Sequence, residues 1–517
     1  MSASREKKQR LTDGSNEKVL TAAEQAAAAK RKTKQYTIIG VVIAVLVAVL
    51  LFWDSGIIQR DATAVTIGDT DYSAAEVNYY YNSLYQEIAL YAQYGLNSYD
   101  VTRSPEDQVY STDSETGEVT TYADYFTDYA VKQLTTITAL YDAAIAEGYT
   151  EADVADVVEQ ELETLATSAS NNGYASSKQM LVAYYGKMVT PSIYRDIVAR
   201  QALASKYLND YTDSLEYTDS DLTAYYEANA DALDTVEYSY LYFKANTVEK
   251  TDADGNELSE EEIAAAEKQA LADAKVKADE AAQMLKDGTA AADVVTACEP
   301  NNSSLDNAVL GSSVNANVSK WLLDSSRTAG DIEVIAYSDY GYYVTIFHDR
   351  YLDETPSVNV RHILVAAELS EGAKTPTDEQ MAEAKARAEE ILSGWQSGKA
   401  SEETFAALAE EHSSDAGSNT NGGLYENVFP GDFVPNFNSW LFNEGERQVG
   451  DVAIIENDGD SSYYGYHVVY FSGVNEGDLE WRNTARSALA DEDVNVWLEG
   501  LTAPLTVTEQ SGLNYIG

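Results

Sequence analysis

The sequence predicts an α+β protein with an N-terminal transmembrane helix, a mostly α-helical domain, two tandem α+β domains and a C-terminal helix. Three observations favour this fold class: a long uncharged apolar run near the N-terminus, a tyrosine-rich region with helix-capping residues, and one sequence pattern that occurs twice. The chain has 517 residues, of which 44% are hydrophobic, so it is long enough to bury several separate cores.

The strong acidity of the chain excludes one class of partner. The net charge is −52, from 34 Lys and Arg against 86 Asp and Glu. Phosphate binding needs clustered cations, so we expect no nucleic acid partner. The acidity leaves two roles open, either solubility or the attraction of basic unfolded chains. Cys298 is the single cysteine, so a disulfide within the chain is impossible.

The N-terminus is predicted to be a membrane anchor. Residues 1–35 carry nine Lys and Arg against four acidic residues, whereas residues 36–53 are 18 residues without a charge. As a helix this run measures about 27 Å, close to a hydrocarbon core of roughly 30 Å. A cleaved signal peptide is the alternative, but the run is long for one and no small-residue cleavage site follows. We therefore expect a single-pass cell membrane protein that contacts the lipid bilayer through residues 36–53. The basic tail is then cytoplasmic and the bulk of the chain extracellular.

The tyrosine-rich segment that follows, residues 54–232, is predicted to be mostly helical. Ser73 and Glu76 have the spacing of a capping box, and Pro191 suits the first turn of a later helix. Residues 475–517 are predicted to close the chain with another helix. Because its apolar face needs a partner, we expect this helix to pack on the helical domain.

Two segments, residues 236–350 and 356–474, repeat one pattern of strand, helix, helix, turn region and two strands. Each copy is predicted to be an α+β unit in which helices cover an antiparallel sheet. The two copies differ in chemistry, because only the second has histidines at the aligned strand positions. The aligned pairs are Tyr240 with His362 and Tyr343 with His467.

The second copy combines several residues at characteristic spacings. One histidine follows a basic residue in the first strand, and another follows a Gly-aromatic pair in the last strand. Between them, an aspartate lies seven positions before a Gly-x-Leu turn, and two phenylalanines lie four positions apart. In this combination the copy resembles the parvulin (PpiC, rotamase) family of peptidyl-prolyl cis/trans isomerases. The whole chain resembles membrane-anchored foldases of the PrsA and SurA type. The resemblance is carried by His362, Asp415, Leu424, Phe433, Phe437 and His467.

The resemblance implies roles for the domains and for individual residues. Residues 54–232 would form a SurA-N-like chaperone domain, residues 236–350 a degenerate parvulin-like domain, and residues 356–474 the isomerase domain. The implied catalytic residues are His362, Asp415 and His467, the implied proline pocket is Leu424, Phe433 and Phe437, and the implied supporting residues are Ser413 and Tyr464.

Two departures from the family pattern concern the turn and the pocket wall. Tyr425 stands where the family's Gly-Asp-Leu-Gly turn has its last glycine, and Gly423 stands in place of the aspartate. The segment from Phe442 to Gly445 is two residues shorter than usual. These are the places where the implied site geometry is expected to differ.

Prolyl isomerisation explains why such a site needs no nucleophile. The reaction rotates an amide bond across a barrier of about 18–20 kcal/mol without making or breaking a bond. A catalyst has to hold the proline ring, weaken amide resonance and favour the twisted state. Two imidazoles and a carboxylate can form a rigid polar half, with no metal and no cofactor.

The function expected from the sequence is that of an extracytoplasmic, membrane-anchored isomerase and foldase. Its partners are unfolded or partly folded exported proteins with X-Pro bonds, and only the second copy is the enzyme. The first alternative is a non-enzymatic holdase that binds extended polypeptides through inactive parvulin-like domains. The second alternative is a wall-associated spacer protein that binds no client proteins. The sequence leaves open whether the chain forms a homodimer.

Overall fold

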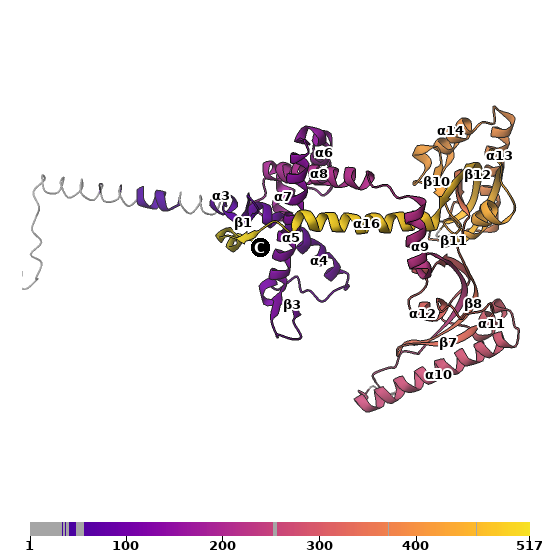
Figure 1. Cartoon of the computed structure of the whole chain (residues 1–517). Helices are drawn as coiled ribbons and strands as arrows, with labels where there is room; N and C mark the ends of the chain where they lie inside the picture. Colours follow the sequence, from indigo (N-terminus) through magenta and orange to yellow (C-terminus); the bar gives the residue numbers. More distant parts are fainter. Residues whose placement is uncertain are drawn as a thin grey trace, which may run out of the picture. The chain divides into compact units, whose positions relative to one another are not determined.

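The computed structural model describes residues 34, 37, 41–47, 56–251, 256–370, 372–461 and 463–517 (Figure 1). The structure is mixed α+β, as predicted, with many helices and four antiparallel sheets in the described ranges. Most of the predicted cytoplasmic tail, residues 1–35, and most of the predicted transmembrane helix, residues 36–53, lie outside the described residues. Among the helices of the ranges given above, none is both long enough and apolar enough to cross a bilayer.

The chain divides into two compact units. Unit 1 comprises residues 1–215 together with residues 493–517, and unit 2 comprises residues 216–492. The division falls within the long helix α16 (Glu480–Thr502). Each unit is described by itself below.

Unit 1 is mostly helical. Its capping box at Ser73 and Glu76 forms as predicted, because each residue's side chain bonds the other's backbone N–H. Pro191 occupies the first turn of its helix, also as predicted. The helices of unit 1 are α3 (Ile57–Arg60), α4 (Ala74–Gln93), α5 (Tyr122–Ala146), α6 (Ala155–Asn171), α7 (Ser177–Tyr185) and α8 (Pro191–Asp213). Its strands are β1 (Thr63–Ile67), β2 (Thr70–Ser73), β3 (Val109–Thr112), β4 (Val119–Thr121) and β13 (Val507–Glu509).

Unit 1 joins segments that lie far apart in the sequence. Strand β13, near the C-terminus, pairs with β1 and completes a three-stranded sheet of order β13-β1-β2. The indole of Trp497 stacks on the ring of Tyr211 at a centroid distance of 3.8 Å. The last turns of α16 therefore pack on α8, where the buried aromatic faces exclude water.

Unit 2 contains two four-stranded antiparallel sheets with equivalent strand orders, β6-β5-β8-β7 and β10-β9-β12-β11. In each sheet the first and last strands of the repeat form the central pair. The first sheet has β5 (Thr235–Lys244), β6 (Asn302–Leu310), β7 (Ile332–Tyr337) and β8 (Gly341–Tyr351), with helices α10 (Glu260–Lys286), α11 (Ala291–Cys298) and α12 (Ser319–Leu322). The second has β9 (Pro356–Ala366), β10 (Leu424–Val428), β11 (Val452–Ser461) and β12 (Tyr463–Leu479), with helices α13 (Asp378–Ser397), α14 (Glu402–His412) and α15 (Pro435–Asn438) and a π-helical turn, Ser439–Asn443.

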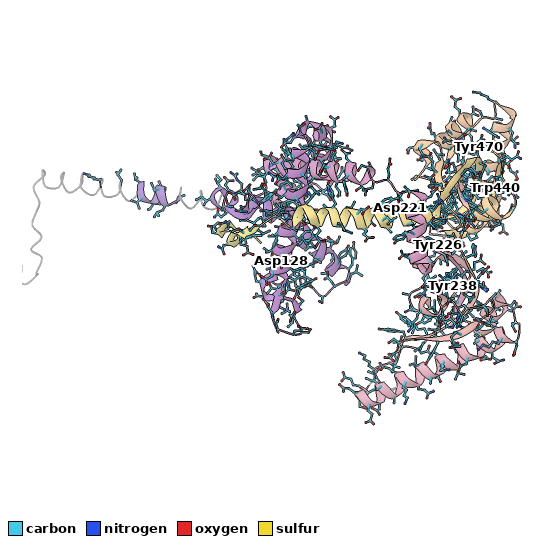
Figure 2. The ribbon with its side chains drawn as sticks, in the orientation of Figure 1. Asp128, Asp221, Tyr226, Tyr238, Trp440 and Tyr470 are labelled. Carbon is cyan, nitrogen blue, oxygen red and sulfur yellow. The ribbon has the colours of Figure 1, made fainter. Side chains whose placement is uncertain are left out.

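The second sheet has two different faces, because side chains alternate along each strand. On one face, Ile363 of β9 packs with Phe405 of α14 and with Tyr470 of β12. On the other, Val360 of β9 packs with Trp440 of the π-helical turn. Figure 2 labels Tyr470 and Trp440 on this second copy. We call the face with Ile363 the helix-covered face, and the face with Val360 the histidine face because it carries His362 and His467.

Unit 2 also holds a helix that precedes both sheets, α9 (Asp219–Leu233), and the first turns of α16. Leu222 and Leu233 of α9 bury themselves against Trp481 of α16. Arg482 pairs with Asp219 at 2.9 Å. The start of α16 thus packs on α9 within unit 2.

Candidate active site

Two imidazoles lie side by side on the histidine face. His362 on β9 is opposite Val469 of β12, and His467 on β12 is opposite Leu364 of β9. This diagonal register places both rings on the same face. Their Nδ1 atoms are 3.0 Å apart, and the rings are stacked with centroids 5.2 Å apart. Both side chains are buried.

Asp415 completes the polar cluster from the loop after α14. Its Oδ2 lies 2.9 Å from Nε2 of His362. The preceding Ser413 attaches this loop to the sheet, because its hydroxyl oxygen accepts the backbone N–H groups of Leu364 and Asp415. The expected supporting residue Ser413 therefore lies beside the site and acts on the position of Asp415.

Hydrogen bonding sets one order of protons along the cluster. An ionised carboxylate only accepts, so His362 donates its Nε2–H to Asp415. The two Nδ1 atoms of His362 and His467 share one hydrogen bond, and Nε2 of His467 faces the amide of Asn457 at 3.4 Å. Asn457 is itself buried, at 2% exposure. The result is a chain of polar groups that runs from Asn457 to Asp415.

The protonation states follow from the surroundings of each group. The hydrogen bond from His362 holds the pKa of Asp415 well below its usual range, with further donors from Ser418, Gly417 and Tyr425. Burial, followed by the neighbouring His362, lowers the pKa of His467 to about 3. At neutral pH the cluster therefore holds a carboxylate anion and a neutral His467.

The apolar half of the site is a stacked pair of phenylalanines. Phe433 and Phe437 lie at a centroid distance of 4.3 Å and an interplanar angle of 19°. Phe437 is fully buried, and its ring centroid is 5.3 Å from that of His467. Pro435 begins the short helix α15, which contains Phe437, and Phe433 lies just before the extended N-cap residue Val434. The predicted pocket residues Phe433 and Phe437 are therefore adjacent to the histidine pair.

Leu424 does not belong to this apolar half, contrary to the expectation. Strand β10 pairs with β9 so that Leu424 is opposite Arg361 and Tyr425 is opposite Val360. The side chain of Arg361 bonds Glu402 of α14 on the helix-covered face, whereas Val360 belongs to the histidine-face core. Because paired residues share a face, Tyr425 and not Leu424 is the residue of this strand on the histidine face.

Tyr464 also lies away from the site, contrary to the supporting role expected for it. It packs with Ile363 and Phe405 on the helix-covered face. Side chains alternate between the two faces of a strand, so Tyr464, three residues before His467, lies on the opposite face from that histidine. Three residues of the polar cluster had no counterpart in the sequence motif. They are Ser418, Tyr425 and Asn457.

The glycine turn before β10 holds the cluster together. Gly422 and Gly423 have φ angles of +73° and +72°, a conformation that side-chain-bearing residues rarely adopt. The Gly423 carbonyl accepts the N–H of His362 at 2.9 Å. Arg361 donates to the Gly422 carbonyl at 3.0 Å. The second glycine, which departs from the family pattern, is therefore required by the backbone conformation.

The first copy has tyrosines at the two aligned positions. Tyr240 and Tyr343 occupy the same diagonal register on β5 and β8, with ring centroids 5.6 Å apart. Its histidine, His348, bonds instead to the hydroxyl of Ser239 at 2.8 Å. Tyrosine rings in this place fill the core and cannot form the imidazole-carboxylate chain of the second copy.

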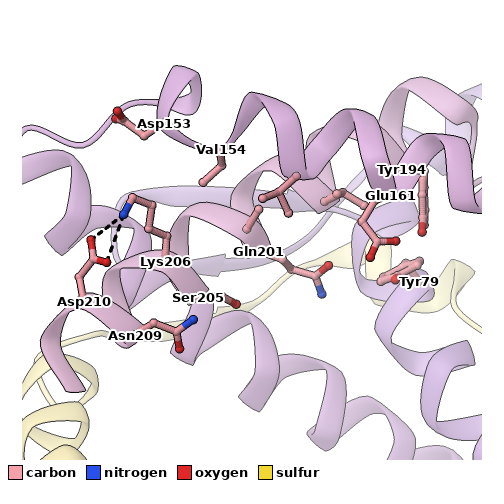
Figure 3. A pocket seen from close by; sticks show the side chains of 13 residues that line it. Tyr79, Asp153, Val154, Glu161, Tyr194, Gln201, Ser205, Lys206, Asn209 and Asp210 are labelled. Atoms are coloured by element: carbon pink, nitrogen blue, oxygen red, sulfur yellow. Dashed lines mark hydrogen bonds and ion pairs between the residues drawn. The ribbon is translucent and has the colours of Figure 1, made fainter. Parts of the chain in front are cut away.

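Unit 1 contains a separate cavity of about 600 Å³ between α6 and α8 (Figure 3). Tyr79, Val154 and Val198 form part of its apolar lining. Its polar lining includes Lys206, which pairs with Asp210 at 2.8 Å. None of the predicted site residues lines this cavity.

Burial of a neutral His467 predicts a loss of stability in mild acid. The unfolded chain takes up a proton at this residue below about pH 6.5, but the folded chain does so only near the lowered pKa of about 3. The contribution of His467 to the free energy of unfolding is therefore fully present above about pH 6.5 and decreases as the pH falls below that value. The contribution lost between pH 8 and pH 5 is about 2 kcal/mol.

Urea unfolding of wild type and of His467→Gln at the two pH values measures this effect. We expect the stability advantage of wild type over the variant to shrink by about 2 kcal/mol at pH 5. Asp415 does not interfere, because the contribution of its lowered pKa is lost only below about pH 3.8. An unchanged difference between the proteins at the two pH values would contradict the prediction.

One family model matches the second copy together with the end of the first. The family model of the PPIC-type PPIASE domain matches residues 342–475, which include His362, Asp415 and His467. The chaperone SurA of Saccharophagus degradans is 27% identical over 248 residues, which are 45% of this chain and 53% of that protein. The chain therefore spans about half the length of that relative.

Among solved structures, two PrsA proteins are similar to long stretches of the chain at low identity. PrsA from Bacillus subtilis is 12% identical, with 77% of this chain and 90% of that chain covered and a TM-score of 0.27. The foldase PrsA from Streptococcus pneumoniae is 11% identical, with 78% and 96% covered and a TM-score of 0.28.

Proposed function

We propose, for a chain that carries a parvulin domain of the PPIC type and is related to the chaperone SurA, that it is a peptidyl-prolyl isomerase that assists protein folding. The observation that carries the proposal is the contact between the two halves of the site. The stacked rings of Phe433 and Phe437 lie against the imidazoles of His467 and His362. A proline ring on the phenylalanines would present its amide bond to the polar chain.

Each half contributes to a different part of the reaction. Burying a proline ring against Phe433 and Phe437 contributes about 1–3 kcal/mol of binding free energy. Amide resonance places negative charge on the carbonyl oxygen, so an anionic Asp415 beside that oxygen disfavours the planar form. The histidine pair keeps the carboxylate in place and does not transfer protons. No bond is broken. The site lowers the free energy of the twisted amide more than that of the planar cis and trans forms.

The second copy, residues 356–474, is the enzyme in this proposal. It alone brings two imidazoles and a carboxylate to one sheet face in the described structure. In the first copy, residues 236–350, tyrosines fill the corresponding place. We assign that copy to binding or spacing, and the helical residues 54–232 to the chaperone body.

The location of the protein is part of the same proposal. The uncharged run at residues 36–53 and the basic residues before it support a single-pass anchor with a cytoplasmic N-terminus. The clients would then be exported proteins with X-Pro bonds, which fold outside the membrane. Measuring whether the protein in whole cells is cut by an added protease tests this orientation.

The enzymatic proposal is tested by exchange in a proline tetrapeptide with the full chain present. We expect NMR exchange spectroscopy to show a cis/trans rate that rises in proportion to protein concentration. His362→Ala should lower this rate, because it removes the ring that links Asp415 to His467. Rates equal to the buffer blank at every protein concentration would refute the activity.

A non-enzymatic holdase is the second candidate, and the cavity in unit 1 favours it. Its lining combines apolar side chains such as Val157, which is 51% exposed, with acidic ones such as Asp153 and Glu161. Such a surface suits apolar segments that carry basic residues. Suppression of client aggregation that survives the double change Phe433→Ala and His467→Ala would support this function. Loss of suppression in that variant would count against it.

A further inference from the structure

Tyr425 occupies the junction between the polar and apolar halves of the site. We propose that Tyr425 is a positioning residue, whose hydroxyl orients the Asp415 carboxylate and whose ring forms the third wall of the proline pocket. The inference rests on the proposed isomerase function. It goes beyond the sequence motif, in which this position is a glycine.

The hydroxyl of Tyr425 acts on one oxygen of Asp415. It donates to Oδ2 at 3.0 Å, and the same oxygen accepts Nε2–H of His362 and the hydroxyl of Ser418. These three donors fill the acceptor capacity of Oδ2, since a carboxylate oxygen has about two lone-pair sites. The other oxygen, Oδ1, accepts the Gly417 amide at 3.2 Å and retains capacity. The arrangement therefore selects Oδ1 as the carboxylate oxygen that faces a substrate.

Tyr425 keeps its proton and remains a donor throughout the physiological range. Burial raises the pKa of its phenol, and the bond to the anionic Asp415 raises it further. The phenol and the carboxylate thus form a charge-assisted hydrogen bond that is stronger than a neutral one. Rotation of the carboxylate about its side-chain bond would break this bond and the one to Ser418 together.

The ring of Tyr425 meets both aromatic groups of the site. It is edge-on to Phe433 at a centroid distance of 5.2 Å and an interplanar angle of 79°. It is also edge-on to His362 at 5.3 Å and 69°. These contacts come from the strand register that turns Leu424 to the opposite face. A proline ring resting on Phe433 would therefore meet Tyr425 beside it.

Two substitutions separate the effects of the hydroxyl and of the ring. Tyr425→Phe keeps the wall and removes the donor, so kcat is expected to fall roughly 10-fold with KM unchanged. Tyr425→Ala removes both, so KM is expected to rise about 5-fold in addition. Tyr463→Phe is the matched control, because this tyrosine of the same copy is 58% exposed. Its kinetics should equal those of wild type.

A spectroscopic measurement on the full chain reports the coupling independently of turnover. The chain has four histidines, so long-range ¹H–¹⁵N spectra resolve the ring nitrogens of each. We expect Tyr425→Phe to shift the Nε2 signal of His362 and to leave His348 and His412 unchanged. A urea unfolding midpoint of Tyr425→Phe equal to that of wild type would show that the variant is folded.

The outcomes distinguish this inference from the proposed function. An active wild type whose Tyr425→Phe variant keeps kcat within twofold, with an unshifted His362 signal, would overturn the role of the hydroxyl. An unchanged KM in Tyr425→Ala would overturn the role of the ring. A wild type without isomerase activity would refute the proposed function, whereas the His362 signal would still test the contact through Asp415.

Discussion

Asp415→Asn is expected to lower kcat/KM for prolyl isomerisation about 100-fold while the protein stays folded. Asparagine keeps the size and shape of the side chain but removes its charge. Hydrogen bonds from His362, Ser418, Gly417 and Tyr425 hold the pKa of Asp415 well below its usual range and keep it an anion, and in the proposed mechanism that charge weakens the amide resonance of the substrate. The amide of asparagine can still accept from His362, so the loss would measure the charge itself.

Peptide exchange rates for wild type and Asp415→Asn check this result. Glu410→Gln on α14 is the control, because it also neutralises one carboxylate and that side chain is exposed in the same copy. The control should retain wild-type rates. If Asp415→Asn keeps more than half of the wild-type kcat/KM, catalysis does not depend on the charge, and the electrostatic part of the mechanism is wrong.

Gly423→Ala is expected to destabilise the second copy by about 3 kcal/mol or more and to abolish most of its activity. Alanine at φ +72° is strained, and its Cβ would overlap the carbonyl oxygen of His362. The same Cβ would lie 2.9 Å from Cβ of Ala409 on α14. Relief of these clashes has to move β9 or the turn, and either shift separates His362 from Asp415.

Gly372→Ala separates conformational strain from the clash. Gly372 has a similar φ of +78°, but a Cβ there meets nothing within 4 Å. We expect it to cost about 1–2 kcal/mol and to leave activity intact. Urea unfolding followed by tryptophan fluorescence measures both variants. Equal destabilisation by the two substitutions would show that strain alone acts at Gly423 and that the close approach to His362 is unimportant.

Much of the candidate site follows from local pattern. The diagonal pair of His362 and His467 was expected from two strand motifs, and the repeat supplied their tyrosine counterparts. Phe433 and Phe437 lie together because they flank the start of the short helix α15, only four positions apart in the sequence. These are features of short segments, in which residue spacing determines which side chains are neighbours.

Strand register explains the residues that the sequence misplaced. Leu424 and Tyr425 are adjacent in β10, and a slip of one residue exchanges the faces on which they lie. The glycine turn with two positive φ angles sets that register. Asn457 reaches His467 only because β11 pairs with β12, and no motif marks it.

The sequence by itself determined the α+β class, the capped helices of unit 1, the tandem repeat, and the residue types of a histidine, carboxylate and phenylalanine site. These properties depend on composition, periodicity and spacing, which are local. Only the tertiary structure decided that Tyr425 and not Leu424 lies on the histidine face, that Tyr464 faces the helices, and that β13 pairs with β1 across more than 400 residues. Those outcomes depend on strand register and on contacts between distant segments, whose energies no single stretch of sequence contains.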